Sequence, residues 1–378
     1  MKNHLKLITA ALLFILTCTS LPAQNKFKLD YKMAEKTIEW LEFINTGADD
    51  NAVKEYFMNE VAPTEGCKTI IQHWARFRDW NNDLFYDFIL EALGRKESGK
   101  PLIDENGNPT FFAQRQNLWQ NALLNPQALR EIIKQMKEMN IEALSEKIAK
   151  NNLPAEAELR NGFYIVVFGH SNAFSVGERN GFDLLQLPRE KDGSIDTQET
   201  IEIFAHELHH TGFSYLSKKY MKNVTDNNKI ILIGILAAEG MPTYLINKPH
   251  EKIEKLKNHH NPARRQLGAE AEKHLNKISD IYKRADNDIA LNLKGEIGLE
   301  EIFSFWMAGY HGPAYDLGAN MFSVIDKHLG RDRLLEIAKD YRTFLDVYNE
   351  AAKIGIAEGE KYFLFDDKLA KDLLTAGE

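Results

Sequence analysis

The chain has 378 residues, 44% of them hydrophobic, which is enough to bury at least one full-sized core. Its formal net charge is -8 and its basic residues are scattered, so we expect no nucleic-acid partner. Two cysteines are too few for a small fold that is held together by disulfides.

Residues 1–23 are typical of a secretory signal peptide. Lys2 and Lys6 provide a positive start, and Leu7 to Leu16 is nearly all apolar. Leu21-Pro22-Ala23 ends this stretch with a small residue suited to cleavage. The apolar run is too short to span a bilayer comfortably. We therefore expect an exported protein, periplasmic or secreted.

Lipid attachment at Cys18 is the weaker alternative. The preceding Thr17 is larger than the Gly, Ala or Ser that such a processing site usually has. Cleavage would remove Cys18 and leave Cys67 unpaired, so we expect no internal disulfide. It would also remove Lys2 and Lys6 but no acid, which moves the net charge from -8 to -10.

Residues 24–154 are predicted to form a helical N-terminal region. Aromatic and aliphatic residues recur at spacings of three and four in segments such as Ile70 to Leu93 and Gln127 to Met139. The sequence Asp104 to Pro109 predicts a turn between such segments.

Beyond Pro154 the pattern changes, and two β-branched and aromatic runs, Phe163 to Phe168 and Phe182 to Leu187, predict strands. A helix is expected from Asp196 or Thr197, either of which can cap it, to about Tyr220. Residues 155–378 therefore predict a second domain with a small sheet. The fold class expected for the whole chain is mostly α, of the α+β type.

A further apolar helix is expected over Lys229 to Ala238, and the chain beyond Pro249 is again helical in pattern. The apolar run Ile230 to Ala238 is short and closes on Glu239 and Gly240. We therefore expect no integral membrane segment in the mature chain. The sequence does not indicate an oligomeric state.

The most informative motif is His206-Glu207-Leu208-His209-His210, which contains His-Glu-x-x-His. Residues four apart on a helix project in nearly the same direction, so His206 and His210 can bind one metal ion. Only these two histidines have Glu207 between them at the required spacing. His209 is expected to be a polar neighbour of the site.

A catalytic zinc ion takes three protein ligands and keeps one position open for water. Glu239 is the best candidate for the third ligand, because a carboxylate at the end of an apolar helix is costly to bury without a cation. Glu207 would then accept a proton from zinc-bound water as the general base. We therefore predict Zn²⁺ as the cofactor, held by His206, His210 and Glu239.

These residues resemble the gluzincin class of zinc metallopeptidases, in which His-Glu-x-x-His is followed on a later helix by Glu-Gly, as in Glu239-Gly240. The aminopeptidase-like branch also has a Tyr-x-x-Gly helix start, which Tyr315 to Gly318 matches. The resemblance covers about Phe163 to Tyr348 and implies a zincin-like fold. It implies that Tyr315 donates a hydrogen bond to the oxyanion, with His311 as the rival donor.

One motif departs from the aminopeptidase pattern. Those enzymes have Gly-x-Met-Glu-Asn before the zinc helix, whose Glu binds the free amine of the substrate. This chain has Val176 to Gly181 at that place, without the methionine and with Glu178 as a displaced acid. Cleavage at chain ends or within chains is therefore left open. The run Phe182 to Leu187 could be an edge strand along which a peptide lies.

The sequence predicts a zinc-dependent hydrolase, most simply a peptidase that acts on a peptide or protein substrate. Hydrolysis of another carbonyl substrate would use the same zinc chemistry. The alternative is a catalytically inactive zinc-binding or helical protein-interaction module, although an inactive metal site would not need the base Glu207.

Overall fold

The computed structural model describes residues 27–75, 79–103, 109–159, 162–170, 172–176 and 179–377. Four features of the sequence lie outside these residues. They are the signal peptide at 1–23, Cys18, Glu178 and most of the turn that begins at Asp104. The other cysteine, Cys67, is buried as a free thiol.

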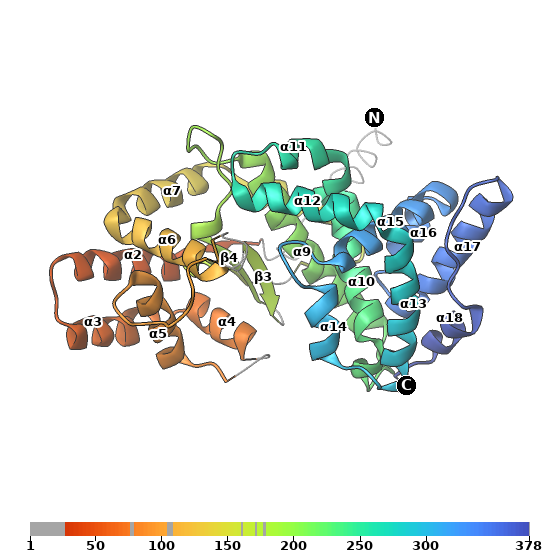
Figure 1. Cartoon of the computed structure of the whole chain (residues 1–378), viewed down its shortest axis with the longest axis horizontal. Coiled ribbons are helices and arrows are strands. Elements are labelled where there is room, and N and C mark those ends of the chain that lie inside the picture. The colour runs from red at the N-terminus through yellow and green to blue at the C-terminus, as the bar shows by residue number, and fades with distance from the viewer. Residues whose placement is uncertain are drawn as a thin grey trace, which may run out of the picture.

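The predicted class is confirmed, because helices make up most of the fold and the sheet is small (Figure 1). The N-terminal helices are α2 (Lys32–Asn45), α3 (Asp50–Tyr56), a π turn (Phe57–Val61), α4 (Glu65–Trp74), α5 (Asn82–Leu93), α6 (Phe111–Leu124), α7 (Pro126–Glu138) and α8 (Ile141–Asn151). The segment expected as one pattern over Ile70 to Leu93 is divided between α4 and α5. Asn81 begins the second helix by accepting a hydrogen bond from the Leu84 N–H (3.0 Å).

The sheet has four strands in the order β1 (Leu29–Asp30), β2 (Gly162–Val166), β4 (Arg179–Asp183) and β3 (Ala173–Val176). The pairs β1–β2 and β2–β4 are parallel, whereas β3 runs antiparallel to β4 at the edge. The expected edge strand Phe182 to Leu187 is therefore wrong. β4 is internal and ends at Asp183, where a 3₁₀ turn (Leu184–Gln186) follows. The carboxylate of Asp183 is buried and accepts the backbone N–H groups of 168–170 and 185, which a continuing strand would not allow.

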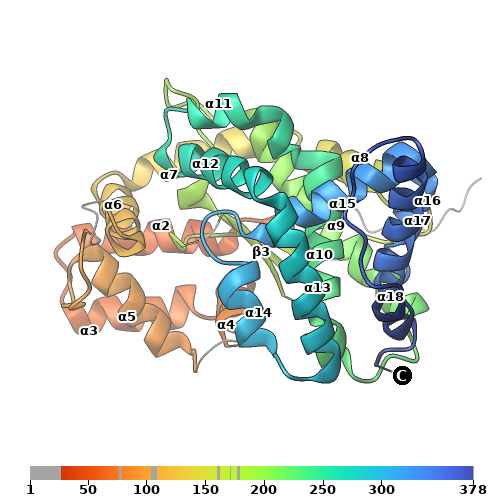
Figure 2. The same cartoon turned by 45° about the vertical axis from the view of Figure 1, so that its right-hand side comes forward.

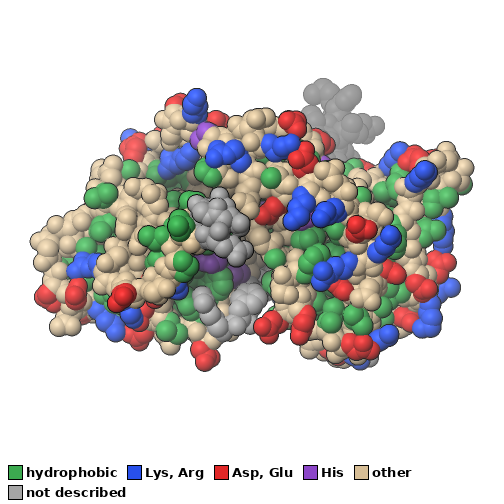
Figure 3. All heavy atoms as spheres, in the orientation of Figure 1, with side chains coloured by type: hydrophobic (Ala, Val, Ile, Leu, Met, Phe, Trp, Pro, Cys, Tyr) green, Lys and Arg blue, Asp and Glu red, His purple; other side chains and the backbone are tan. Residues whose placement is uncertain are grey.

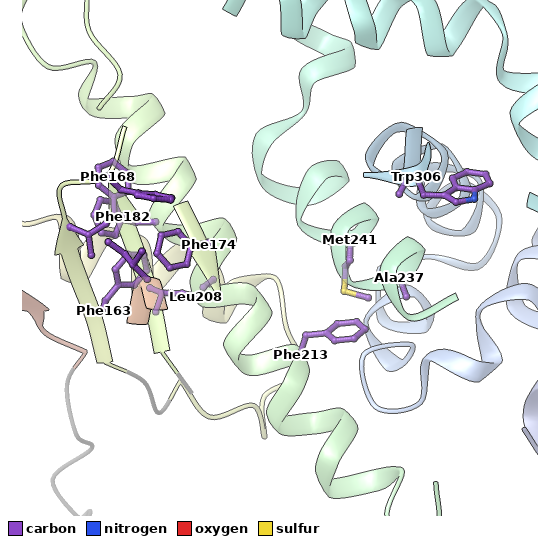
Figure 4. Close-up of a cluster of buried hydrophobic side chains, with 14 of the residues drawn as sticks. Phe163, Phe168, Phe174, Phe182, Leu208, Phe213, Ala237, Met241 and Trp306 are labelled. Carbon is purple, nitrogen blue, oxygen red and sulfur yellow. The ribbon is translucent and has the colours of Figure 1, made fainter. Parts of the chain in front are cut away.

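Helix α9 (Thr197–Tyr220) lies between the sheet and the C-terminal helices. Asp196 caps it, as expected, by accepting the Glu199 N–H (2.9 Å). Leu208 lies with the phenylalanines of the sheet, whereas Phe213, farther along the helix, points toward α10 (Figure 4). One helix thus joins two parts of the hydrophobic core.

The remaining elements are a 3₁₀ turn (Asn227–Ile230), α10 (Ile231–Pro242), a π turn (Thr243–Asn247), a 3₁₀ turn (Pro249–Lys252), α11 (Ile253–Lys257), α12 (Pro262–Asn276), α13 (Ile278–Lys294), α14 (Leu299–Trp306), α15 (Pro313–Leu329), α16 (Arg331–Glu336), a 3₁₀ turn (Tyr341–Thr343), α17 (Phe344–Ala357) and α18 (Asp367–Leu374). These helices form the right-hand half of Figure 1, with α10 and α15 at its centre.

Helices α10 and α15 touch through glycine. A Cβ on Gly240 would lie 2.4 Å from the Gly318 Cα, and a Cβ on Gly318 would lie 2.3 Å from the Leu236 carbonyl oxygen. Both distances are far shorter than a carbon atom tolerates against backbone. The two backbones can therefore approach this closely only because neither position has a side chain.

Within the described part of the chain, one stretch, Asn227–Asn247, is long and apolar enough to cross a membrane by length and composition. It is longer than the run expected from sequence because turns extend α10 at both ends. A buried core helix has the same properties, and 56% of the most apolar window is buried. Acidic and basic side chains are interspersed over the face shown in Figure 3.

The helix crossing can be tested with Gly318→Ala. The added methyl group collides with backbone that cannot move independently, so we expect the free energy of unfolding to fall by about 3 kcal/mol or more. Urea denaturation measures this loss. The matched control is Gly234→Ala on α10, whose Cβ would meet only ring atoms of Tyr341 at 3.3 Å. There the change should stay within about 1 kcal/mol. Equal effects of the two variants would contradict the packing argument.

Candidate metal centre

The three motif residues of α9 lie in its buried middle. His206 and His210 are one turn apart with ring centroids 4.7 Å apart, and Glu207 is 8% exposed. The spacing of four therefore brings the two imidazoles together, as the helical periodicity predicts.

Glu239 reaches the same point from α10. Its Oε2 lies 3.4 Å from His206 Nε2 and 3.3 Å from His210 Nε2. A tetrahedral zinc ion with bonds of about 2.0–2.2 Å needs ligand atoms about 3.3 Å apart. The donor set of two imidazole nitrogens and one carboxylate oxygen thus fits zinc in both chemistry and spacing.

The electrostatics of the three groups follow from their closeness. Burial alone would lower the pKa of His210, but the Glu239 carboxylate outweighs it and raises the pKa to about 9. Burial would raise the pKa of Glu239, yet the two imidazoles hold that pKa well below its usual range. Without a metal ion, a proton on His210 partly takes the place of the cation.

His206 is oriented by a residue that the sequence did not single out. Its Nδ1 hydrogen-bonds to the side-chain oxygen of Asn247, at the end of the π turn that follows α10. The Nδ1–H as donor leaves Nε2 free of hydrogen and directed at the metal position. No motif marks this asparagine, since it is 41 residues away along the chain.

Glu207 has a partner on the edge strand. The Ser175 hydroxyl lies 2.7 Å from Glu207 Oε2 and 2.6 Å from Asn180 Oδ1. Asn180 in turn donates to the Thr211 hydroxyl, one turn beyond Glu207 on α9 (3.2 Å). Strand β3 therefore holds the carboxylate of the candidate base. Ser175 was not predicted as a site residue, and its position before the motif-like segment 176–181 is the one sequence signal for it.

Tyr315 lies in the first turn of α15, beside the metal ligands. Burial, with the carboxylates of Glu239 and Glu207, raises its pKa well above the usual range, and it hydrogen-bonds to Glu239. The phenol therefore stays protonated and can act as a donor. The ring of His311 stacks on it, with centroids 5.0 Å apart at an interplanar angle of 24°.

The hydrogen bonds of His311 go to two carboxylates that are not metal ligands, Asp316 and Glu270. Its Nε2 bonds to Asp316 Oδ1 (2.8 Å), and its backbone N–H donates to Glu270 Oε2 (2.8 Å). Asp316 is completely buried and also binds His250 Nε2 (2.7 Å) and His274 Nδ1 (2.6 Å). Against the cost of burial, these imidazoles hold the pKa of Asp316 far below its usual range. This cluster was not predicted from the sequence, because its histidines are spread along the chain.

His209 points away from the metal position. Its Nε2 donates to the Asn152 carbonyl (3.1 Å), and burial first, then the neighbouring imidazoles, lowers its pKa well below the usual range. It therefore joins α9 to the end of α8 and takes no part in the ligand set.

The centre opens into a cleft of about 240 Å³. His206, Glu207, His311 and Tyr315 line this cleft, together with residues of the β3 edge and of the hairpin α11–α12. The sequence-predicted residues are thus brought together, with four of them facing one cavity and Glu239 completing the ligand set behind it.

A second group of possible ligands, His328, Glu358 and Glu360, lies where α15 ends. Glu360 is already paired with Lys327 (2.6 Å), and Glu358 is largely exposed. Surface carboxylates of this kind are common without a metal ion, so this group does not compete with the site on α9.

The family model described as "Putative zinc dependent peptidase (DUF5700)" matches residues 42–354, which is most of the chain. No curated protein and no solved structure gives a significant match. The matched region includes the whole ligand set and the cleft, and leaves out β1, most of α2, the end of α17 and α18.

Metal analysis tests the ligand set. His206→Ala or Glu239→Ala should reduce bound zinc from about one ion per chain to almost none, because two remaining ligands bind weakly. The control is His209→Gln, which alters the same helix but leaves all three ligands. Mass spectrometry of the intact protein under native conditions gives the stoichiometry. Zinc retained at about one ion per chain in either Ala variant, or lost equally in His209→Gln, would contradict the assignment.

Zinc binding should release protons at neutral pH. In the metal-free protein the pKa of His210 is about 9, so zinc must displace the proton on this imidazole at pH 7. Apparent zinc affinity should therefore rise with pH until about 9 and then level off. The ion pair of protonated His210 with Glu239 also stabilises the metal-free fold. Its contribution is complete below the ordinary histidine pKa of 6.5 and is lost as pH rises through about 9. Calorimetry in buffers of different ionisation enthalpy measures the released protons, and a pH-independent affinity would contradict the prediction.

Proposed function

This chain belongs to the zinc-dependent peptidase family DUF5700, and we propose on that premise that it hydrolyses peptide bonds with Glu207 as the general base. The observation that carries the proposal is the convergence of His206, His210 and Glu239 beside this carboxylate. His206, His210 and Glu239 would hold a zinc ion there, and the ion would supply Lewis acidity toward a carbonyl and water. An inactive zinc-binding module would need neither the base nor the cleft.

Glu207 takes the proton from the attacking water and passes it to the amine that leaves. The Ser175 hydroxyl, 2.7 Å from its Oε2, holds the carboxylate in one orientation during this transfer. Ser175 belongs to β3 at the edge of the sheet, and an extended peptide can lie along such an edge strand.

Tyr315 donates its phenol to the oxygen that becomes negative as water adds to the carbonyl. Its high pKa keeps the proton available, and the stacked ring of His311 fixes its orientation. His311 is the weaker candidate for this role because its Nε2 is bonded to Asp316.

We also propose that the site is of the gluzincin type, with Glu239 as the third ligand. The aminopeptidase-like branch has less support, because residues 176–181 lack the methionine of its motif and have the acid, Glu178, at a displaced position. The apolar residues 7–16 support export, to the periplasm or the outside, where peptides would be the substrates.

A peptide library digested by the zinc-loaded protein tests the function. Glu207→Gln should keep zinc and lose turnover almost completely, because an amide cannot accept the proton. Tyr315→Phe keeps the base and should lower kcat about 100-fold with little change in KM. Cleavage sites are read by mass spectrometry, with zinc content measured on each variant. Full activity of the Gln variant would refute the mechanism, and no cleavage by the unaltered protein would refute the function.

A further inference from the structure

A contact that the mechanism does not use joins a loop at the cleft to helix α6. Tyr310, in the loop between α14 and α15, lines the cleft next to His311. Its ring stacks on Phe111 of α6, with centroids 4.8 Å apart at 28°, and its hydroxyl donates to Gln114 Oε1 (2.6 Å). We call the contact of Tyr310 with Phe111 and Gln114 the cleft bridge.

The α6 end of the cleft bridge belongs to the sheet side of the cleft. Trp119 of α6 donates its indole N–H to the Phe168 carbonyl (3.0 Å), just after β2. Its ring also lies against Gly169, whose left-handed backbone has no room for a Cβ. Helix α6 is thus fastened to the β2–β3 connection, which leads to the edge strand of the cleft.

The other end is fastened to the opposite wall. The Glu270 carboxylate of α12 accepts the backbone N–H of His311 (2.8 Å) and lies against Gly309, whose φ is +82°. In Figure 2 this loop reaches from the C-terminal helices toward the side of the molecule that carries α6. Residues almost 200 positions apart (196 between Tyr310 and Gln114) therefore meet at one end of the cleft wall that Tyr310 lines.

We propose that the cleft bridge restricts this peptidase to short, unfolded peptides. This inference rests on the proposed function. A loop of a folded protein enters a cleft with chain leaving at both ends, so it needs an open groove. Here residues of α11 and α12 line the cleft, and the cleft bridge connects the Tyr310 loop through α6 to the β2–β3 connection. The cavity of about 240 Å³ is below the usual size of a small-ligand site. A short peptide can enter such a site end first.

The test compares one cleavable sequence in two contexts. A fluorogenic peptide of about eight residues carries a sequence selected from the library digest, and the same sequence is placed in a surface loop of a stable host protein. The unaltered protein should cleave the peptide with a kcat/KM about 100-fold above that for the loop. A short synthetic peptide that carries the sequence with the residues flanking it in the host should be cleaved like the fluorogenic peptide, which shows that the sequence itself is acceptable.

Two variants open the cleft bridge. Phe111→Ala, at a side chain that is 56% exposed, and Tyr310→Ala should each raise kcat/KM for the folded loop about tenfold. Tyr310→Phe keeps the stacked ring and should have a smaller effect. The matched control is Leu124→Ala, on the same helix and 82% exposed, which should change neither activity. Hydrogen exchange of the metal-free protein gives a second measurement, with faster exchange at 307–312 in Phe111→Ala than in the control.

The outcomes separate the two proposals. Cleavage of neither peptide nor loop by the unaltered protein would refute the function itself. Equal cleavage of both would refute the restriction while the function stands. The restriction is also wrong if the variants cleave the folded loop no faster than the unaltered protein does.

Discussion

The close approach of α10 and α15 at Gly240 and Gly318 is the constraint on which the site depends. Glu239 immediately precedes the first glycine, and Tyr315 lies one turn before the second. Because backbone meets backbone at the crossing, the carboxylate and the phenol are brought to the same point beside α9. Larger side chains would separate the helices and move both groups. The glycines that follow Glu239 and Tyr315 therefore have a mechanical role in the site.

The carboxylates of Glu239 and Asp316 are both largely withdrawn from water, and their charges are stabilised in different ways. Glu239 lies 3.3–3.4 Å from its two imidazoles, a spacing that leaves room for an ion between them. Asp316 lies 2.6–2.8 Å from three imidazoles, so direct hydrogen bonds stabilise its charge and no ion fits between. The Asp316 cluster joins α15 to the 3₁₀ turn Pro249–Lys252, to α12 and to the loop before α15. It thereby holds together the wall on which Tyr315 stands.

The cleft draws on the whole chain. The N-terminal region contributes β1 to the sheet and α6 to the cleft bridge, and β3 contributes the hydroxyl that orients Glu207. Helix α9 packs against both the sheet and α10, so a rigid core supports the ligands from two sides (Figure 4). Such support matters because hydrolysis requires the base, the metal ligands and the oxyanion donor to keep fixed distances.

The sequence by itself determined what depends on neighbouring residues. Helical periodicity and the Asp196 cap predicted α9 and the shared direction of His206 and His210, since both follow from residues within one or two turns. The apolar run before Glu239 predicted a buried helix for the same local reason. The class of the fold followed from such patterns summed along the chain.

Only the tertiary structure decided which distant residues meet. Ser175 and Asn247 reach the site across 32 and 41 residues, and no spacing rule connects them to the motif. Strand order also depends on residues far apart in the sequence. The pattern of Phe182 to Leu187 does not show that β3 pairs with β4 and takes the edge position in the sheet. Side-chain pairing across the fold depends on packing and on the cost of burying charge, and these quantities exist only once the chain is folded.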